Sequence, residues 1–275
     1  MSLPILEVRH EPSETDLVRL FHRTEAMWVG HLADGESLDV GTAYANGSLS
    51  RVWDANNVRD ASLAGEATPQ QAVAAAQAHY ASRGTRCAYW VMNPSAGPEQ
   101  TQPLIDHLVA GGHRAQSDDI LYLRRTPAQA IPEVADLKII PARASYRHVR
   151  RLVEEKTAER WPADADQLVD AHLRHLDDPH VDALLALRGE RPVAFLGVLA
   201  VGELGRIESV YVSAEFRGRG IGRVMMARGL EICARSLFKH VYILAEPANG
   251  AAQSLYQGFG FEKIGEVMSY RAAVD

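Results

Sequence analysis

The chain has 275 residues, of which 47% are hydrophobic and 23% charged, and its net charge is −6 at neutral pH. This composition is that of a globular protein, and the length predicts two domains. The acidic balance argues against nucleic acid as a partner, because proteins that bind it usually carry a basic face. No run of 18 apolar residues and no basic leader with an apolar core occurs, so we expect no membrane association and a cytoplasmic location.

The two cysteines, Cys87 and Cys233, lie far apart and form no Cys-x-x-Cys pair. Neither a zinc site nor a disulfide framework is indicated, and two reduced core residues are expected.

The first part of the chain predicts a mixture of helices and strands. Asn46-Gly47, between two apolar runs, is typical of a hairpin turn. Helices are expected at 16–32, at 69–83, where Pro69 would stand in the first turn, and at 103–110, with a strand at 86–92. Prolines at 127 and 132 mark a linker over 126–136. We therefore divide the chain into domains at 1–125 and 137–275.

The second part has a clearer periodicity. Strands are expected at 138–142 and 204–212, a hairpin at 181–201 with its turn at Gly189-Glu190, and a strand at 241–245. Helices are expected at 146–160, 164–176 and 251–257, with Asp164 as an N-cap. The order predicts an α/β fold with a mixed sheet flanked by helices.

A glycine- and arginine-rich loop joins the strand at 204–212 to a helix that follows it. It reads Arg217-Gly218-Arg219-Gly220-Ile221-Gly222-Arg223. Bare successive amides and the helix N-terminus suit a phosphate. A Walker loop would need Lys-Ser or Lys-Thr after the glycines, and a dinucleotide fingerprint would need a third small residue where Arg223 stands. An ordinary strand-to-helix turn is the simpler alternative.

The pattern Arg-x-x-Gly-x-Gly at Arg217, Gly220 and Gly222 resembles the acyl-CoA pyrophosphate loop of the GNAT acetyltransferase superfamily. Asn249, Tyr256 and the run Gly258-Phe259-Gly260-Phe261 resemble the end of the same domain. The resemblance implies acetyl-CoA as co-substrate and no metal. It also implies a set of cofactor-binding residues: Val210, Tyr211, Val212, Arg217, Gly218, Arg219, Gly220, Ile221, Gly222, Arg223 and Asn249.

The first half resembles a degenerate copy of the same domain. Tyr122 stands nine positions after His113 (122 − 113), and Tyr270 stands nine positions after Phe261 (270 − 261). The copy has no Gly-x-Gly loop after Trp53, and Leu108 stands where the second half has Tyr256. We therefore expect two tandem GNAT-like domains, the first of them degenerate and inactive.

The implied reaction is attack of a neutral amine on the thioester of acetyl-CoA. Strand alternation places Arg206, Glu208 and Val210 on one face, and Ile207, Ser209 and Tyr211 on the other. The resemblance implies a base on the face that carries Glu208, which makes Glu208 the candidate base. A salt bridge between Glu208 and Arg206 is the structural alternative. By resemblance, the Val210 amide would polarise the acetyl carbonyl.

By the same resemblance, Tyr256 would protonate the leaving thiolate, although a core aromatic is the alternative. His172 and His175 share a helical face, yet their spacing indicates no metal site, and a solvated face or a contribution to substrate binding is expected. Trp161 either covers the acceptor pocket or anchors the loop between two helices.

The sequence thus predicts an acetyl-CoA-dependent N-acetyltransferase acting on a primary amine of a small molecule or peptide, as a monomer or homodimer. A non-catalytic acyl-CoA-binding or regulatory protein that retains the fold is the alternative. The acceptor, the acyl chain length and O-transfer stay open.

Overall fold

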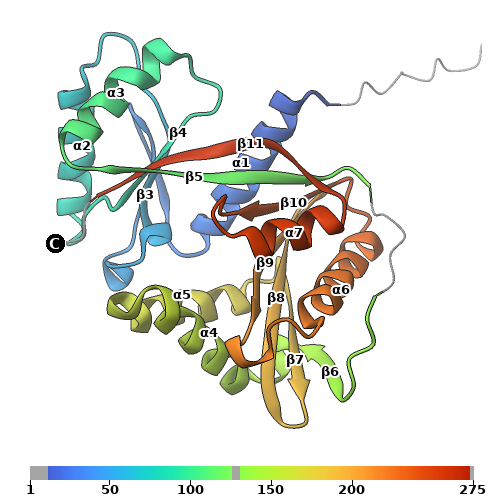
Figure 1. The fold of residues 1–275 in the computed structure, drawn as a ribbon. Coiled ribbons are helices and arrows are strands. Elements are labelled where there is room, and N and C mark those ends of the chain that lie inside the picture. The colour runs from blue at the N-terminus through green and yellow to red at the C-terminus, as the bar shows by residue number, and fades with distance from the viewer. Residues whose placement is uncertain (1–11, 126–130, 273–275) are drawn as a thin grey trace, which may run out of the picture.

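The structure is a computed structural model that describes residues 12–125 and 131–272. Their strands form one eleven-stranded mixed sheet in the order β1-β2-β3-β4-β11-β5-β10-β9-β8-β7-β6, with helices against its faces (Figure 1). The α/β fold and the mixed sheet expected from the sequence are therefore confirmed.

The first half supplies one side of this sheet. Its helices and strands are α1 (Glu14–Gly30), β1 (Gly35–Leu38), β2 (Gly41–Ala45), β3 (Asn56–Ala61), α2 (Pro69–Ala81), β4 (Tyr89–Met92), α3 (Pro98–Ala110) and β5 (Arg114–Leu123). Capping boxes start α1 at Ser13 and α2 at Thr68, and Pro69 stands in the first turn of α2.

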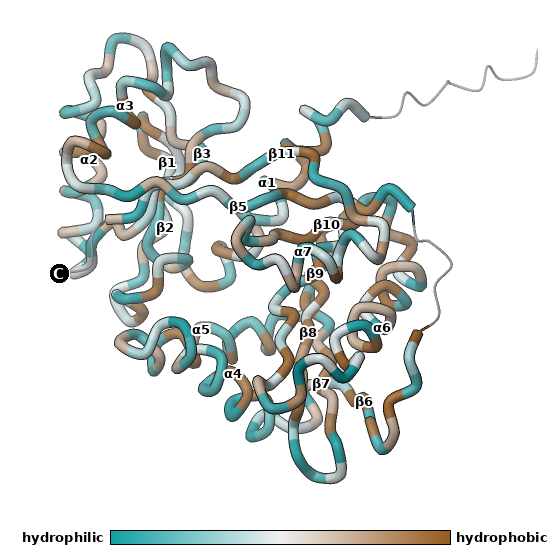
Figure 2. Tube along the Cα trace, viewed as in Figure 1, coloured by the Kyte–Doolittle hydropathy of each residue, from teal (hydrophilic) through white to brown (hydrophobic). Residues whose placement is uncertain are grey.

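The second half supplies the other side. Its elements are β6 (Leu137–Pro141), α4 (Tyr146–Arg160), α5 (Ala165–Asp177), β7 (Val181–Arg188), β8 (Arg191–Val201), β9 (Leu204–Val212), α6 (Ile221–Arg235), β10 (His240–Ala245), α7 (Gly250–Gly258) and β11 (Phe261–Arg271). Helices α4 and α5 pack on one face of β8 through Phe195, and α6 packs on the other through Leu196. Figure 2 shows the hydrophobic residues concentrated along these central strands.

The two halves exchange their last strands. Strand β5 lies between β10 and β11 and is antiparallel to both, with Leu121 opposite Ile243 on one side and Lys263 on the other. Strand β11 in turn lies between β5 and β4 of the first half. Each half therefore completes the sheet of the other, a connection that the separate domains at 1–125 and 137–275 did not anticipate. The boundaries themselves stay a prediction, and residues 126–130 of the expected linker lie outside the described residues.

The internal resemblance has a structural counterpart. The parallel pair β3–β4 in the first half corresponds to the parallel pair β9–β10 in the second, and each is followed by a helix and an exchanged strand. In the first half β3 leads toward α2 without a glycine-rich loop, in keeping with a degenerate copy.

Most element predictions hold within a few residues, and one is wrong. Asn46-Gly47 is not a hairpin turn: β2 pairs with β3, and two short 3₁₀ turns fill the connection between them. The side chain of Asn46 instead accepts a hydrogen bond from the amide of Ser48, so it caps a turn rather than closing a hairpin. Asp164 occupies the N-cap position of α5, yet its side chain makes no capping hydrogen bond.

Helix α1 ties the halves together on one face of the sheet. Its buried Leu17 and Phe21 share a hydrophobic cluster with Leu199 of β8 and Tyr242 of β10, so a helix of the first half covers strands of the second. None of the described helices combines the length and apolar character needed to span a bilayer.

Strand β5 is part of the first half but pairs only with strands of the second. A substitution that destabilises β5 should therefore unfold both halves in a single transition. Ile120 is fully buried in the cluster below α1, and Ile120→Ala should lower the free energy of unfolding by about 2–5 kcal/mol. Urea unfolding followed by fluorescence and by circular dichroism should give one coincident transition at a lower midpoint.

Val109→Ala is the control for this variant, because Val109 is 51% exposed and should change stability by no more than about 0.5 kcal/mol. Two separate transitions, with only one of them moved by Ile120→Ala, would contradict the exchange of strands.

Candidate functional site

A cavity of about 320 Å³ lies where the two halves meet, and both contribute to its walls. The first half supplies side chains from α1, β3, β4 and β5 and from the turn before β3. The second half supplies α4, α5, β9, β10, α7 and β11. The exchange of β5 and β11 is what brings these elements to one place.

On the side of the second half, the cavity opens where β9 and β10 separate. Their parallel pairing runs from Leu204 opposite His240 to Ile207 opposite Ile243 and stops there. Both strands continue, β9 to Val212 and β10 to Ala245. Beyond Ile207 the facing edges of the two strands no longer pair with each other, which leaves backbone groups for an extended ligand.

A β-bulge in β9 stands at the head of this opening. Glu208 pairs with Gly197 and Tyr211 with Phe195, so two residues of β9, Ser209 and Val210, oppose a single residue of β8. Ser209 has a φ of 53°, in the left-handed region. A bulge leaves a backbone group unpaired and re-aims the strand.

This bulge overturns the predicted alternation of side chains. Residues directly opposite each other in an antiparallel pair share a face, so Glu208 and Tyr211 lie on the same face as Gly197 and Phe195. Val210 packs instead with the cluster beneath α6. The prediction that Val210 shares a face with Glu208 and that Tyr211 lies opposite is therefore wrong, because one inserted residue reverses the register. Val210 still lines the cavity.

The glycine-rich loop has the backbone conformation expected of an anion cradle. Gly218 and Gly220 have φ values of 75° and 79°, which favour glycine, and Gly220 is the N-cap of α6. A Cβ on Gly220 would lie 2.9 Å from Cγ of Pro132, whereas one on Gly222 would meet only ordinary contacts with Leu255 and Val212. The loop therefore presents amides at the N-terminus of a fifteen-residue helix.

The arginine side chains of the loop are partly engaged elsewhere. Arg217 donates to the carbonyl of Val212 at 3.0 Å and to Glu159 of α4 at 2.7 Å. The guanidinium of Arg219 lies 5.4 Å from the ring centroid of Phe216. The positive potential of the loop thus comes from its amides and the helix end, with the arginines around it.

Asn249 and Tyr256 lie on the opposite wall of the opening, at the two ends of α7. Asn249 caps the helix by accepting from the amide of Ala252 at 3.1 Å, and it lines the cavity. Tyr256 is buried among Phe261 and its neighbours, and it too lines the cavity. Burial, and then the charge of Glu208, raise the pKa of the Tyr256 hydroxyl, which keeps it protonated at neutral pH.

Glu208 lines the cavity and forms the ion pair with Arg206 that was the structural alternative, and its role as a base stays a prediction. Burial raises the pKa of Glu208 to about 7, against the opposing charge of Arg206 and with help from Glu25 and Asp54. A carboxyl group of this pKa exchanges protons readily near neutral pH.

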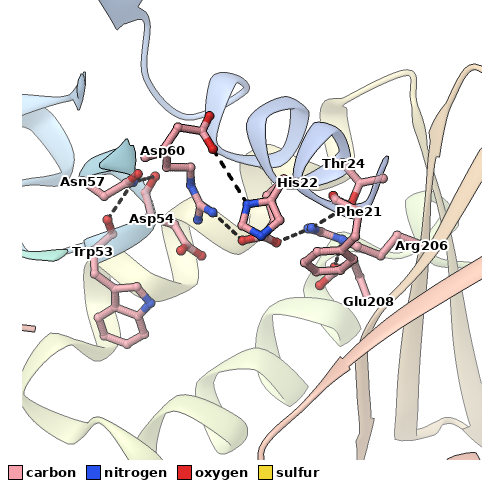
Figure 3. A network of polar contacts seen from close by, with 11 residues as sticks. Phe21, His22, Thr24, Trp53, Asp54, Asn57, Asp60, Arg206 and Glu208 are labelled. Carbon is pink, nitrogen blue, oxygen red and sulfur yellow. Dashed lines mark hydrogen bonds and ion pairs between the residues drawn. The ribbon is translucent and has the colours of Figure 1, made fainter. Parts of the chain in front are cut away.

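Arg206 leads to residues that the sequence analysis missed. Glu25 of α1 forms buried ion pairs with Arg206 of β9 and with Arg59 of β3, the latter at 2.5 Å. Figure 3 shows this network, in which α1, β3 and the turn before β3 meet β9 of the other half. The sequence did contain a signal for Glu25. Helical spacing from Leu17 and Phe21 places it on the apolar face of α1, where a buried carboxylate needs a charged or hydrogen-bonding partner.

Aromatic rings and charged groups form the remaining wall of the cavity. Trp28, Trp53 and Tyr89 come from the first half, and Trp161 from the loop between α4 and α5. Trp161 meets the edge of Trp53, with ring centroids 5.1 Å apart, so it both lines the cavity and anchors its loop.

Two carboxyl groups and one amine are perturbed on this wall. Burial raises the pKa of Asp54, and burial followed by repulsion from Glu246 raises that of Asp118 to about 6. Burial lowers the pKa of Lys156 on α4 to about 8. These groups line one cavity, and their clustering at a concave site is typical of functional sites.

The two histidines of α5 do not lie on a solvated face. His172 lines the cavity, and burial lowers its pKa well below the usual value. His175 stacks on Trp28 with ring centroids 3.5 Å apart, and burial lowers its pKa to about 3. Both rings are therefore neutral near pH 7. Across residues 12–125 and 131–272, no three His, Cys, Asp or Glu side chains are grouped so that they could hold a metal ion.

Comparison with known proteins finds a family model that matches part of the second half. The model of the acetyltransferase (GNAT) family matches residues 146–261, which run from the start of α4 to the start of β11. The mycothiol acetyltransferase of Kocuria rhizophila is 33% identical over 69 residues, which are 25% of this chain and 23% of that protein. The N-alpha-acetyltransferase RimI of Mycobacterium tuberculosis is 27% identical over 135 residues, which are 48% of this chain and 84% of that protein.

The whole fold, with both halves, also has a solved counterpart. A GCN5-related N-acetyltransferase from Kribbella flavida aligns over 93% of this chain and 95% of its own, with a TM-score of 0.62 and 14% identity. At this identity the likeness concerns the fold alone, and it extends through the first half, as two GNAT-like domains would require.

The raised pKa of Glu208 predicts how stability depends on pH. A carboxyl whose folded pKa is about 7 and whose unfolded pKa is near 4.5 binds more protons when folded, so its contribution to stability is lost as pH rises from about 4.5 to 7. Glu208→Gln should remove that loss and raise the free energy of unfolding at pH 8, relative to the native protein, by up to about 3 kcal/mol.

Urea midpoints at pH 5 and pH 8 measure this effect. Glu262→Gln serves as the control, since the Glu262 side chain is 63% exposed and should leave the pH dependence of the native protein in place. An unchanged pH dependence in Glu208→Gln would contradict the assigned pKa.

Proposed function

Residues 146–261 of the chain belong to the acetyltransferase (GNAT) family, and from this premise we propose that the protein is an acetyl-CoA-dependent N-acetyltransferase that acetylates a primary amine of a small molecule or peptide. One observation carries the proposal: Glu208 lines a cavity that has the opening of β9 and β10 on one side, where we place the cofactor, and side chains of the first half on the other, where we place the acceptor. A donor and an acceptor can therefore meet at one carboxylate.

The co-substrate fits the opening through backbone groups. The amides from Gly218 to Gly222 and the N-terminus of α6 suit its pyrophosphate. The unpaired edge of β9 at Val210, Tyr211 and Val212 suits its extended amide-containing arm, which would pair like an added strand. Asn249 faces the same opening from α7. In this arrangement the bulge at Ser209 leaves an amide near the head of the arm, where a donor would stabilise charge on the acetyl oxygen.

Glu208 then serves as the general base. An alkylamine with a pKa of about 10.4 is almost entirely protonated at pH 7 and cannot attack until it loses a proton. A carboxylate with a pKa of about 7 can accept that proton directly or through water. The amine adds to the thioester carbon, the C–S bond breaks, and the thiolate takes a proton from Tyr256, whose hydroxyl is kept protonated by burial.

The first half supplies the acceptor wall in this proposal. Trp28, Trp53 and Tyr89 offer apolar faces, and Asp54 and Asp118 offer carboxylates. Such a wall suits an amine whose carbon skeleton packs on the rings while its polar groups reach the carboxylates. The curated relatives named above, a mycothiol acetyltransferase and an N-alpha-acetyltransferase, are consistent with both a small amine and a peptide N-terminus.

Binding of coenzyme A tests the cofactor side with a matched pair of glycines. Gly218 and Gly189 have φ values of 75° and 60°, and a Cβ on either would meet open space. Gly218→Ala should weaken coenzyme A binding in calorimetry by about tenfold, because it perturbs an amide of the cradle at a cost of about 1–3 kcal/mol. Gly189→Ala carries the same backbone strain in the β7–β8 turn and should leave the affinity unchanged. Equal effects, or no binding by the native protein, would reject the loop assignment.

Transfer from acetyl-CoA to a panel of amines and peptides tests the chemistry. Glu208→Gln should lower kcat/KM by about 10²–10⁴-fold without changing coenzyme A affinity, because only the base is lost. Tyr256→Phe should lower kcat by a smaller factor, since a thiol near pKa 8.5 leaves with little help. If coenzyme A binds and the native protein transfers to no amine, the non-catalytic acyl-CoA-binding alternative is favoured.

A further inference from the structure

A buried cluster of alternating charges joins the first half to the base. Arg59 of β3 donates to Glu25 of α1 at 2.5 Å, and Glu25 in turn pairs with Arg206 of β9, which lies beside Glu208. The side chains of Arg206, Arg59 and Glu25 are 1%, 6% and 9% exposed. A cluster this dry interacts strongly, since little water screens its charges.

Arg206 contacts the first half and Glu208 through different nitrogens of its guanidinium. Its Nη1 donates to Glu25 and, at 3.2 Å, to the hydroxyl of Thr24. Its Nε forms an ion pair with Glu208 Oε1, so the guanidinium is shared between the two carboxylates. The guanidinium is also held between the rings of Phe21 and Trp28 of α1, at 5.6 and 5.5 Å from their centroids. Helix α1 thus fixes where Arg206 points.

We propose that Glu25 is a positioning residue for the transfer reaction: it engages Arg206 from the first half and so keeps Glu208 available as a base. This inference rests on the proposed role of Glu208. It assigns to the degenerate half a catalytic contribution that operates through charge rather than through contact with either substrate.

The charges around Glu208 set the sign of the effect. Arg206 on its own strand lowers the pKa of Glu208, whereas Glu25 of α1 and Asp54 of the turn before β3 raise it, and Lys156 of α4 lowers it. The neutral His172 and the protonated Tyr256 also line the cavity beside Glu208. The other ionisable side chains of the cavity are Arg59, Tyr89, Asp118, Arg160, Glu246 and Arg271.

Without Glu25, two buried arginines would face Glu208 with one fewer anion between them. Arg206 would then bind Glu208 fully, hold it ionised to lower pH, and make it a weaker base. Without the charge of Arg59, by contrast, Glu25 would bind Arg206 alone, and Glu208 would become easier to protonate.

The experiment compares pH profiles of kcat/KM, after Glu208→Gln has shown which limb belongs to Glu208. Glu25→Gln, which is isosteric, should move the acid limb down by about one pH unit. Glu25→Asp, which keeps the charge, should leave the limb near its native position, and Arg59→Gln should move it up. Coenzyme A affinity should not change in any of these variants, because the cluster does not touch the loop.

Arg51→Gln is the matched control. It removes another ion pair between the halves, from Arg51 to Asp166 of α5, but one that is exposed and remote from Glu208, so the limb should not move. If Glu25→Gln leaves the acid limb where it is, or if Glu25→Gln and Arg59→Gln move it in the same direction, the inference is overturned. If Glu25→Gln fails to fold, the upward shift in Arg59→Gln decides.

A direct titration separates this inference from the proposed function. The side-chain carbon of Glu208, observed by carbon-13 NMR in the full chain and assigned with Glu208→Gln, should titrate at lower pH in Glu25→Gln than in the native protein. A native protein that transfers to no amine would overturn the proposed function, while this titration would still support or reject the coupling. Identical titration in both proteins would reject it.

Discussion

The pairing of β5 with β11 is the constraint on which the molecule depends. Neither strand has both of its neighbours within its own half, so the backbone amides and carbonyls of each are satisfied only when the other half is present. The cavity follows from this exchange, because β5 brings Asp118 to its wall and β11 brings Val267 and Arg271. A site at such a seam cannot be assigned to one domain, even though the family motifs all lie in the second half.

The exchange also explains how a half without a cofactor loop remains useful. Between β3 and α2 the first half has no glycine pair in the left-handed conformation that could mimic Gly218 and Gly220. It has kept apolar packing on the shared sheet through Leu17 and Phe21, and the same helix face carries Glu25 and Trp28 to the cavity. One half thus carries the proposed phosphate cradle, whereas the other supplies aromatic rings and buried charged groups to the cavity.

The sequence predicted those features of the fold that depend on local periodicity or on a single motif. The strand that ends at Val212, the loop from Arg217 and the helix after it are local, so α6 and β9 lie where they were expected. The bulge at Ser209 was invisible, because an inserted residue leaves the alternating pattern intact in the sequence while reversing the face of everything after it. Asn46-Gly47 misled for a related reason: a strong turn signal does not say which strands its turn connects. The exchange of β5 and β11 could not be predicted either, since two copies of one unit carry equivalent strand edges and sequence does not distinguish pairing within a half from pairing between halves.

If Glu208 is the base, as proposed, the buried charges explain why a second carboxylate accompanies it. Glu208 in a dry cavity without a cation would stay protonated and could not accept a proton, whereas Glu208 bound fully by Arg206 would be too weak a base for an amine. Because Arg206 is shared with Glu25, the basicity of Glu208 lies between these two limits. Against the effect of burial, Arg59 and Arg206 lower the pKa of Glu25 to about 2, so Glu25 is ionised near neutral pH. Two members of this charge cluster, Glu25 and Arg59, thus come from a half that carries no part of the acetyltransferase motif.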